Sequence, residues 1–162
     1  MSSHPSDEAS DVRPIRWLVC LMFFTFAMTT DAVGSVIPRV VAEFALTLTQ
    51  ASAFQYASML GIAAGALLLG FLADRLGRKR AIVLGLALYG AASLLFAAGN
   101  QFAAFVALLV LSGFGISVFK IGALALIGDV SSSTAAHTRF MNTVEGFFAV
   151  GAIVGPAIVA LL

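Results

Sequence analysis

Long apolar runs separated by short polar stretches set the pattern of this sequence. Five runs reach the roughly 20 residues that a helix needs to cross the hydrocarbon core of a bilayer, namely residues 17–38, 50–73, 81–98, 102–127 and 139–162. Each run is continuously apolar, whereas a membrane-barrel strand alternates polar and apolar positions over about ten residues. The pattern therefore predicts an all-α polytopic membrane protein of about five transmembrane helices, preceded by a polar tail over residues 1–16.

Composition and charge support this prediction and orient the chain. Apolar residues make up 60% of it and charged residues 10%, against about 25% charged residues in soluble domains. With the N-terminus in the cytoplasm, Arg39 is outside and Lys120 lies within a span, whereas the other basic residues are cytoplasmic, as the positive-inside rule requires. These residues are Arg13, Arg16, Arg75, Arg78, Lys79, Arg80 and Arg139. We therefore expect a multi-pass protein of a bacterial inner (plasma) membrane, with a cytoplasmic N-terminus.

Few residues of the chain suit enzymatic chemistry. Its single cysteine, Cys20, lies in the first apolar run, so it forms no disulfide within the chain and is expected to be buried and unreactive. His4 falls in the tail and His137 in a polar turn, and no cluster of catalytic or metal-ligand residues accompanies them. The sequence predicts no enzyme, no cofactor, no metal site and no nucleic-acid partner.

A tight basic loop joins the second and third apolar runs. Residues 70–80 read Gly-Phe-Leu-Ala-Asp-Arg-Leu-Gly-Arg-Lys-Arg. Gly70 would let another helix approach closely and Gly77 would allow a tight turn, while Asp74 at a helix end could accept hydrogen bonds from backbone donors or an arginine. Such a loop could latch and release during a conformational cycle. The alternative is that its arginines only set the topology.

Six residues of this loop carry a family resemblance. Gly70, Asp74, Arg75, Gly77, Arg78 and Lys79 match the G-x-x-x-D-R-x-G-R-[KR] signature of the major facilitator superfamily, and the chain resembles the first five of that family's twelve helices. The resemblance implies a secondary transporter that works by alternating access, with a gating loop at these six positions. It also implies that the chain is truncated, with membrane lipid, a small solute, protons and the missing second half of the transporter as partners.

Small residues recur four positions apart in two of the runs. Gly61 and Gly65 form one such pair, and Gly151 and Gly155 form another. In membranes these pairs let helix backbones pack closely. We therefore expect close helix contacts at both pairs.

Three ionisable residues, Asp31, Lys120 and Glu145, fall inside apolar spans. Each costs about 2.5–3.5 kcal/mol on insertion scales, so each requires a partner or a function. From the helical rise, Lys120 and Glu145 both lie about 8 Å to the cytoplasmic side of their span centres, and Asp31 lies about 6 Å to the outer side. Lys120 and Glu145 are therefore predicted to form an intramembrane ion pair, in a structural or a functional role.

Asp31 has no basic residue at its own depth. A carboxylate without a cation in a low dielectric should be partly protonated near neutral pH, which suits a proton-coupling group. Acidic residues of the first helix serve this role in several sugar–proton symporters of the family that the loop resembles. Alternatively, Asp31 faces an aqueous vestibule, or bonds to Thr29, Thr30 or another helix.

Four further polar residues in the spans are candidates for a substrate cavity, Gln55, Tyr56, Asn142 and Thr143. Their hydrogen-bonding groups could hold a polyol, or they could bond helices together. Residues 140–156, taken with residues 30–34 and Pro38, resemble the fucose and glucose/galactose symporter branch. Together with the four polar residues, this resemblance favours a proton-coupled carrier of a sugar or another small polar metabolite. The alternatives are a drug or aromatic-acid carrier of the same fold, and a non-transporting membrane receptor or regulatory half-bundle.

Overall fold

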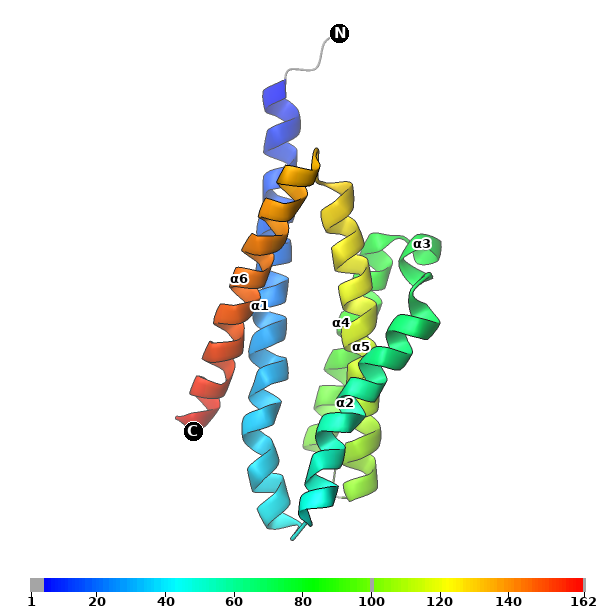
Figure 1. The fold of residues 1–162 in the computed structure, drawn as a ribbon, viewed down its shortest axis with the longest axis vertical. Coiled ribbons are helices and arrows are strands. Elements are labelled where there is room, and N and C mark those ends of the chain that lie inside the picture. Colours follow the sequence, from blue (N-terminus) through cyan, green and yellow to red (C-terminus); the bar gives the residue numbers. More distant parts are fainter. Residues whose placement is uncertain (1–4, 100, 162) are drawn as a thin grey trace. The chain divides into compact units, whose positions relative to one another are not determined.

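The structure, a computed structural model, describes residues 5–99 and 101–161, apart from the side chains of residues 5–11, 55, 72 and 73. These residues form helices and no strand. The helices are α1 (Pro5–Glu43), α2 (Leu48–Leu69), α3 (Leu72–Leu76), α4 (Arg78–Ala97), α5 (Phe102–Asp129) and α6 (Thr134–Ala160) (Figure 1). Five of them, all except α3, are long and apolar enough to cross a membrane. The predicted all-α fold class is confirmed.

The helix ends differ from the predicted spans, because a helix continues beyond the hydrocarbon core. α1 begins at Pro5, so the described part of the predicted tail is helical. The predicted run 50–73 is divided, since α2 ends at Leu69 and the short α3 follows. The carbonyl of Phe71 accepts the amides of Asp74 and Arg75, which starts this new helix.

Local sequence fixes where two of the long helices start. Thr47 caps α2 in a capping box, because its hydroxyl accepts the Gln50 amide at 3.3 Å while the Gln50 side chain accepts the Thr47 amide at 2.9 Å. Ser133 caps α6 by accepting the Ala136 amide at 3.2 Å. Both caps satisfy amides that have no partner inside the helix.

The chain divides into two compact units, of which the second spans Arg39–Leu126. In this unit α5 packs against α2 through small residues. A Cβ atom at Gly61 would collide with the backbone carbonyl of Val110, and one at Gly65 would lie 2.8 Å from the Ser117 Cβ. The close contact expected at the Gly61–Gly65 pair is therefore confirmed.

The opposite side of α5 packs against α4 in the same manner. A Cβ at Gly115 would lie 2.6 Å from the Tyr89 amide nitrogen, and one at Gly122 would lie 3.0 Å from the Ile82 amide nitrogen. Gly85 of α4 approaches the backbone of Phe119 equally closely. Lying between two partners, α5 has the largest buried share of the five long helices.

An aromatic cluster closes one end of the second unit. Phe105 of α5 lies at its centre, with its ring centroid 4.8 Å from that of Phe96 and 5.5 Å from that of Phe44. Phe54 of α2 stands 5.5 Å from Phe102 and 6.5 Å from Phe105. These edge and tilted contacts connect α2, α4, α5 and the segment that follows α1.

The first unit consists of residues Met1–Pro38 and Ile127–Leu162, and in its described part α1 runs parallel to α6 (Figure 1). The two helices touch where a Cβ at Gly151 would collide with the Phe24 carbonyl and one at Gly155 with the Met28 carbonyl. The close contact predicted for this glycine pair is confirmed as well. Val19, Cys20, Phe23 and Val144 are buried in this unit, so Cys20 is buried as predicted.

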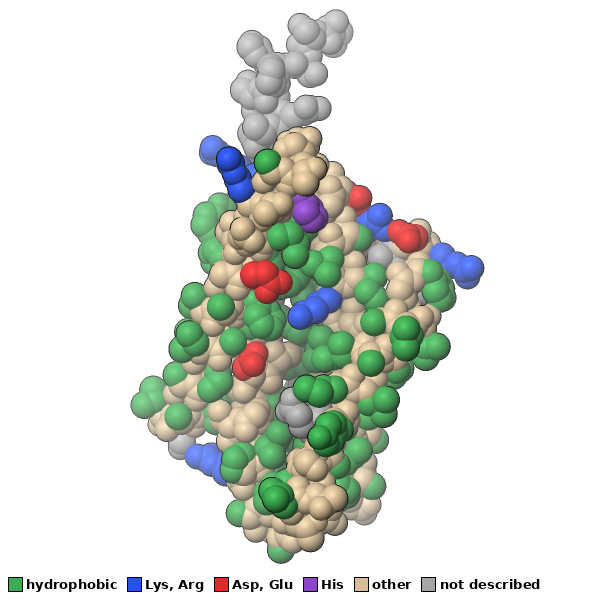
Figure 2. Space-filling view, viewed as in Figure 1, with side chains coloured by type: hydrophobic (Ala, Val, Ile, Leu, Met, Phe, Trp, Pro, Cys, Tyr) green, Lys and Arg blue, Asp and Glu red, His purple; other side chains and the backbone are tan. Residues whose placement is uncertain are grey.

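Large apolar side chains face outward from both units. Leu67, Leu94 and Ile153 are 85%, 77% and 72% exposed, and Figure 2 shows hydrophobic side chains along the whole visible length of the helices. Soluble monomers rarely expose apolar patches of this extent. Lipid is the environment in which such a surface is stable, so the chain is a multi-pass membrane protein.

The glycine contacts generate a stability prediction. Gly61→Ala should lower the free energy of unfolding by about 1–3 kcal/mol, because its Cβ forces α2 away from the Val110 backbone. Gly90→Ala in α4 is the matched control, since nothing lies within 4 Å of its Cβ position. It should raise stability by about 0.5–1 kcal/mol through helix propensity. Equilibrium unfolding in detergent, followed by circular dichroism, measures the free energy of unfolding of both variants. Equal changes in the two variants would contradict close packing of α2 on α5 at Gly61.

Candidate functional site

The basic loop is built around Gly77, which separates α3 from α4. Its φ of 84° and ψ of 153° place it in a backbone region that is essentially restricted to glycine. Gly77 therefore provides the predicted tight turn. The turn allows Arg78, the first residue of α4, to face back toward α3.

Across this turn Asp74 and Arg78 form an ion pair. The Arg78 Nη1 atom donates a hydrogen bond of 2.6 Å to the Asp74 Oδ1 atom. The Asp74 side chain is 76% exposed and that of Arg78 is 30% exposed. An exposed pair of this kind contributes at most about 1 kcal/mol to stability, so it can break and re-form without unfolding the loop.

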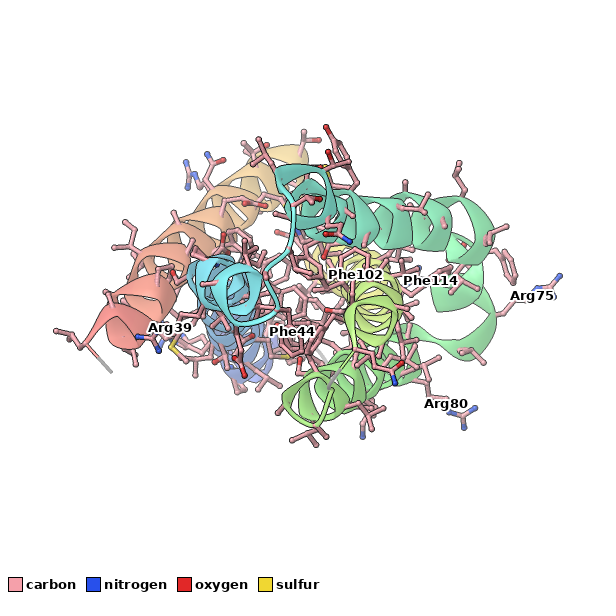
Figure 3. All side chains as sticks on the ribbon, turned by 90° about the horizontal axis from the view of Figure 1, so that it is seen from below. Arg39, Phe44, Arg75, Arg80, Phe102 and Phe114 are labelled. Atoms are coloured by element: carbon pink, nitrogen blue, oxygen red, sulfur yellow. The ribbon has the colours of Figure 1, made fainter. Side chains whose placement is uncertain are left out.

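The remaining basic residues of the loop point elsewhere. The Arg75 guanidinium lies over the Phe71 ring, 4.8 Å from its centroid, and Lys79 is exposed. Arg75 and Arg80 extend away from the helices of the second unit (Figure 3). The loop thus presents positive charge outward.

Among the described residues, Gly70 does not make the close contact with another helix that the sequence predicts for it. Apart from its two chain neighbours, the only described residue within 4 Å of a Cβ placed there is Ala66 of the preceding helix, whose carbonyl oxygen lies at 2.9 Å. Close approach to another described helix therefore does not account for this glycine. Its part in the predicted gating loop stays a prediction.

Asp31 lies in α1, exposed within the first unit. The Thr30 hydroxyl, which also reaches the Ala27 carbonyl, donates a hydrogen bond of 3.2 Å to the Asp31 Oδ2 atom. Among the described residues of this unit, Asp31 forms no recorded ion pair. Thr29 instead bonds to carbonyls of its own helix, so the contact with Thr30 is the one expected alternative that the structure records.

The other intramembrane charges belong to different units. Lys120 is half-buried in α5 of the second unit, and Glu145 is exposed on α6 of the first. Their ion pair stays a prediction.

The substrate-cavity candidates are also distributed over both units. Tyr56 is 67% exposed on α2, and the side chain of Gln55 lies outside the described residues. Asn142 is exposed on α6, where Thr143 donates a hydrogen bond of 2.9 Å to the carbonyl of Arg139. Their role in a cavity stays a prediction.

One feature of the first unit was not predicted from the sequence. A pocket between α1 and α6 is lined by Arg13, Arg16 and Arg139. In the sequence pattern these arginines serve only to orient the chain in the membrane. Residues 13, 16, 17 and 20 recur at helical spacing, and so do residues 136, 140, 143 and 147 on the face that continues to Gly151. This periodicity places each set of residues on one face of its helix, but it does not show that the two faces meet.

Comparison with known proteins decides the family. A sequence model of the Major Facilitator Superfamily matches residues 19–162. The chain belongs to this superfamily. The resemblance carried by the loop signature is therefore confirmed, and the Asp74–Arg78 pair lies inside that signature.

The chain is similar to three curated relatives. It is 31% identical over 158 residues to the 3-(3-hydroxy-phenyl)propionate transporter of Escherichia coli, an alignment that covers 98% of this chain and 38% of the relative. It is 28% identical over 125 residues to the 4-hydroxybenzoate transporter PcaK of Pseudomonas aeruginosa, covering 75% and 28%. It is 34% identical over 89 residues to the quinolone resistance protein NorA of Staphylococcus aureus, covering 55% and 23%.

The chain thus spans less than two fifths of the length of these relatives. Two of them are named as transporters and none is named as an enzyme, in agreement with the prediction that the chain is not an enzyme. None of these three relatives is named as a sugar–proton symporter, so the predicted sugar–proton branch is not confirmed.

The loop geometry generates a prediction for the full-length gene product. Asp74→Asn should reduce transport at least tenfold while leaving membrane insertion and thermal stability unchanged, because it removes the charge-assisted bond to Arg78 from a pair that contributes little to stability. Arg78→Ala should behave in the same way. Arg80→Gln is the matched control, since it removes a charge from the same loop outside the signature. If Asp74→Asn transports normally, the loop only sets topology.

Proposed function

We propose that this chain is part of a secondary active transporter that carries small aromatic carboxylates across the membrane by alternating access. The observation that carries the proposal is the identity of 31% over 98% of the chain with a transporter named for 3-(3-hydroxy-phenyl)propionate. A second relative, named for 4-hydroxybenzoate, transports a compound of the same class. Of the carriers considered from the sequence, the relatives favour an aromatic-acid carrier over a sugar carrier.

The described residues suit an acidic aromatic substrate. Lys120 lies half-buried within the apolar span of α5, where an ammonium group can receive a substrate carboxylate and offset part of its own desolvation. Sites of this kind lie near the bilayer midplane, between the halves of a transporter.

Proton coupling is the second part of the proposal, with Asp31 as the coupling group. It stands inside the span of α1 with one recorded polar contact, from the neighbouring Thr30 hydroxyl. A hydroxyl can donate to the ionised carboxylate and accept from the protonated one. Asp31 can therefore change protonation state without losing this partner, which a group that binds a proton on one side and releases it on the other requires.

Uptake by the full-length gene product in proteoliposomes tests the substrate class. We expect saturable uptake of labelled 3-(3-hydroxyphenyl)propionate that excess 4-hydroxybenzoate inhibits and excess glucose does not. Lys120→Gln should raise the KM about tenfold or more, because a buried charge pair with the carboxylate is lost. Saturable uptake of glucose without uptake of either acid would support the sugar branch. Absence of any saturable uptake would support a non-transporting receptor.

Asp31→Asn separates proton coupling from substrate binding. The amide mimics the protonated carboxyl group, so exchange of substrate at equal concentrations should continue at a rate close to that of the unchanged protein. Accumulation driven by a pH gradient should fail, and Asp31→Glu should restore part of it. Undiminished accumulation by Asp31→Asn would eliminate the proposed role, and loss of exchange as well would indicate a structural or substrate-binding role.

A further inference from the structure

A cavity of about 390 Å³ lies in the first unit, between the N-terminal part of α1 and the N-terminal half of α6. The two helices touch at Gly151 and Gly155, and large side chains separate them nearer their N-terminal ends. The described residues that line the cavity are Arg13, Arg16, Trp17, Cys20, Ala136, Arg139, Phe140, Thr143 and Phe147. It is a basic pocket with aromatic walls.

The charge of this pocket is uncompensated among the described residues. Three guanidinium groups line it, no described lining residue is acidic, and no ion pair joins these arginines to a described side chain of the unit. Three like charges around one small cavity repel one another unless an anion lies between them. Arginines are also the side chains best suited to bind phosphate in a bidentate manner.

The aromatic walls hold the pocket open. The Arg16 guanidinium lies over the Phe140 ring, 5.0 Å from its centroid, which fixes the plane of its donors. Trp17 and Phe147 meet edge to face with ring centroids 5.9 Å apart. The positions of the donors are thus partly set before any ligand binds.

The depth of the pocket indicates the source of the anion. By the helical rise, its three arginines lie about 12–22 Å from the middles of the spans Val12–Glu43 and Thr134–Ala160, whereas Phe147 lies at the middle of its span. Trp17, 61% exposed, is a residue type enriched at the level of lipid headgroups. The basic end of the pocket therefore lies at the interface, away from the midplane where transported substrates bind, and its aromatic wall at Phe147 extends into the span.

An apolar surface continues from the pocket toward the membrane interior. One turn beyond Trp17 lies Leu21, 53% exposed, and one turn beyond Phe147 lies Val150, 54% exposed. A ligand with an anionic head and a hydrocarbon tail fits both parts. We propose that the pocket binds the phosphate headgroup of an anionic phospholipid, with an acyl chain lying along Leu21 and Val150. Basic pockets between helices at this level suit such headgroups.

Trp17 provides a direct measurement, because it is the only tryptophan of the 162-residue chain. The chain is reconstituted in phosphatidylcholine vesicles that contain either brominated phosphatidylglycerol or brominated phosphatidylcholine, and quenching of Trp17 fluorescence reports which lipid occupies the site. We expect phosphatidylglycerol to be preferred about fivefold or more at low salt. The preference should weaken at 1 M salt. A preference near one would overturn the proposal.

Three variants separate a built site from general charge attraction. The triple variant Arg13→Gln, Arg16→Gln, Arg139→Gln should lose the preference, whereas Arg75→Gln, Lys79→Gln, Arg80→Gln, which removes equal charge from the exposed loop, should keep it. Equal losses in both would overturn the proposal. The triple lysine variant Arg13→Lys, Arg16→Lys, Arg139→Lys keeps the positive charge and so the orientation of the chain in the membrane. It should still lose at least half of the preference for phosphatidylglycerol, because lysine offers no bidentate donor pair. An unchanged preference in it would indicate charge attraction alone.

Soluble anions distinguish the lipid from other sources of the same chemistry. Glycerol 3-phosphate and 4-hydroxybenzoate at millimolar concentration should leave the quenching by brominated phosphatidylglycerol unchanged, because neither supplies the acyl chain. Displacement by glycerol 3-phosphate would indicate a site for a soluble phosphate. Displacement by 4-hydroxybenzoate would indicate a site for the transported acid. Either result would overturn the assignment to a lipid.

Discussion

Direct contact between helix backbones, made where glycine leaves no side chain between them, is the interaction on which both units depend. Lipid tails are as apolar as leucine, so the hydrophobic effect does not drive membrane helices together, and van der Waals contact must do so. In the second unit α5 contacts α2 at Gly61 and α4 at Gly85. In the first unit α6 contacts α1 at Gly151 and Gly155. The large apolar side chains are then left free to face the lipid.

The position of these contacts also shapes the first unit as a site. α1 and α6 meet closely at Phe24 and Met28, and about two to three turns away Trp17, Phe140 and three arginines stand between them. The same pair of helices thus supplies a rigid contact within the span and a basic pocket at its end. A lipid bound there would hold the two helix ends together without filling the path of a transported solute.

The loop of the second unit combines a fixed element with an adjustable one. Gly77 fixes the turn, because its backbone conformation excludes other residues. The Asp74–Arg78 bond is short but exposed, and exposed pairs contribute little net free energy. A contact of this strength can exchange partners at low cost, whereas a deeply buried pair would resist such a change.

The sequence by itself determined the number of long helices, the class of protein and the family, because continuous apolar length and a short signature are local properties. It also indicated the close contacts at Gly61 and Gly151, since small-residue spacing is itself a packing signal. It did not locate the end of α2 at Leu69 or the start of α3, where the Phe71 carbonyl accepts the amides of Asp74 and Arg75. Only the tertiary structure joined Arg13 and Arg16 to Arg139, which follows them by more than a hundred residues. That pocket exists because α1 and α6 pack in one register, and no local pattern encodes the register between two distant helices.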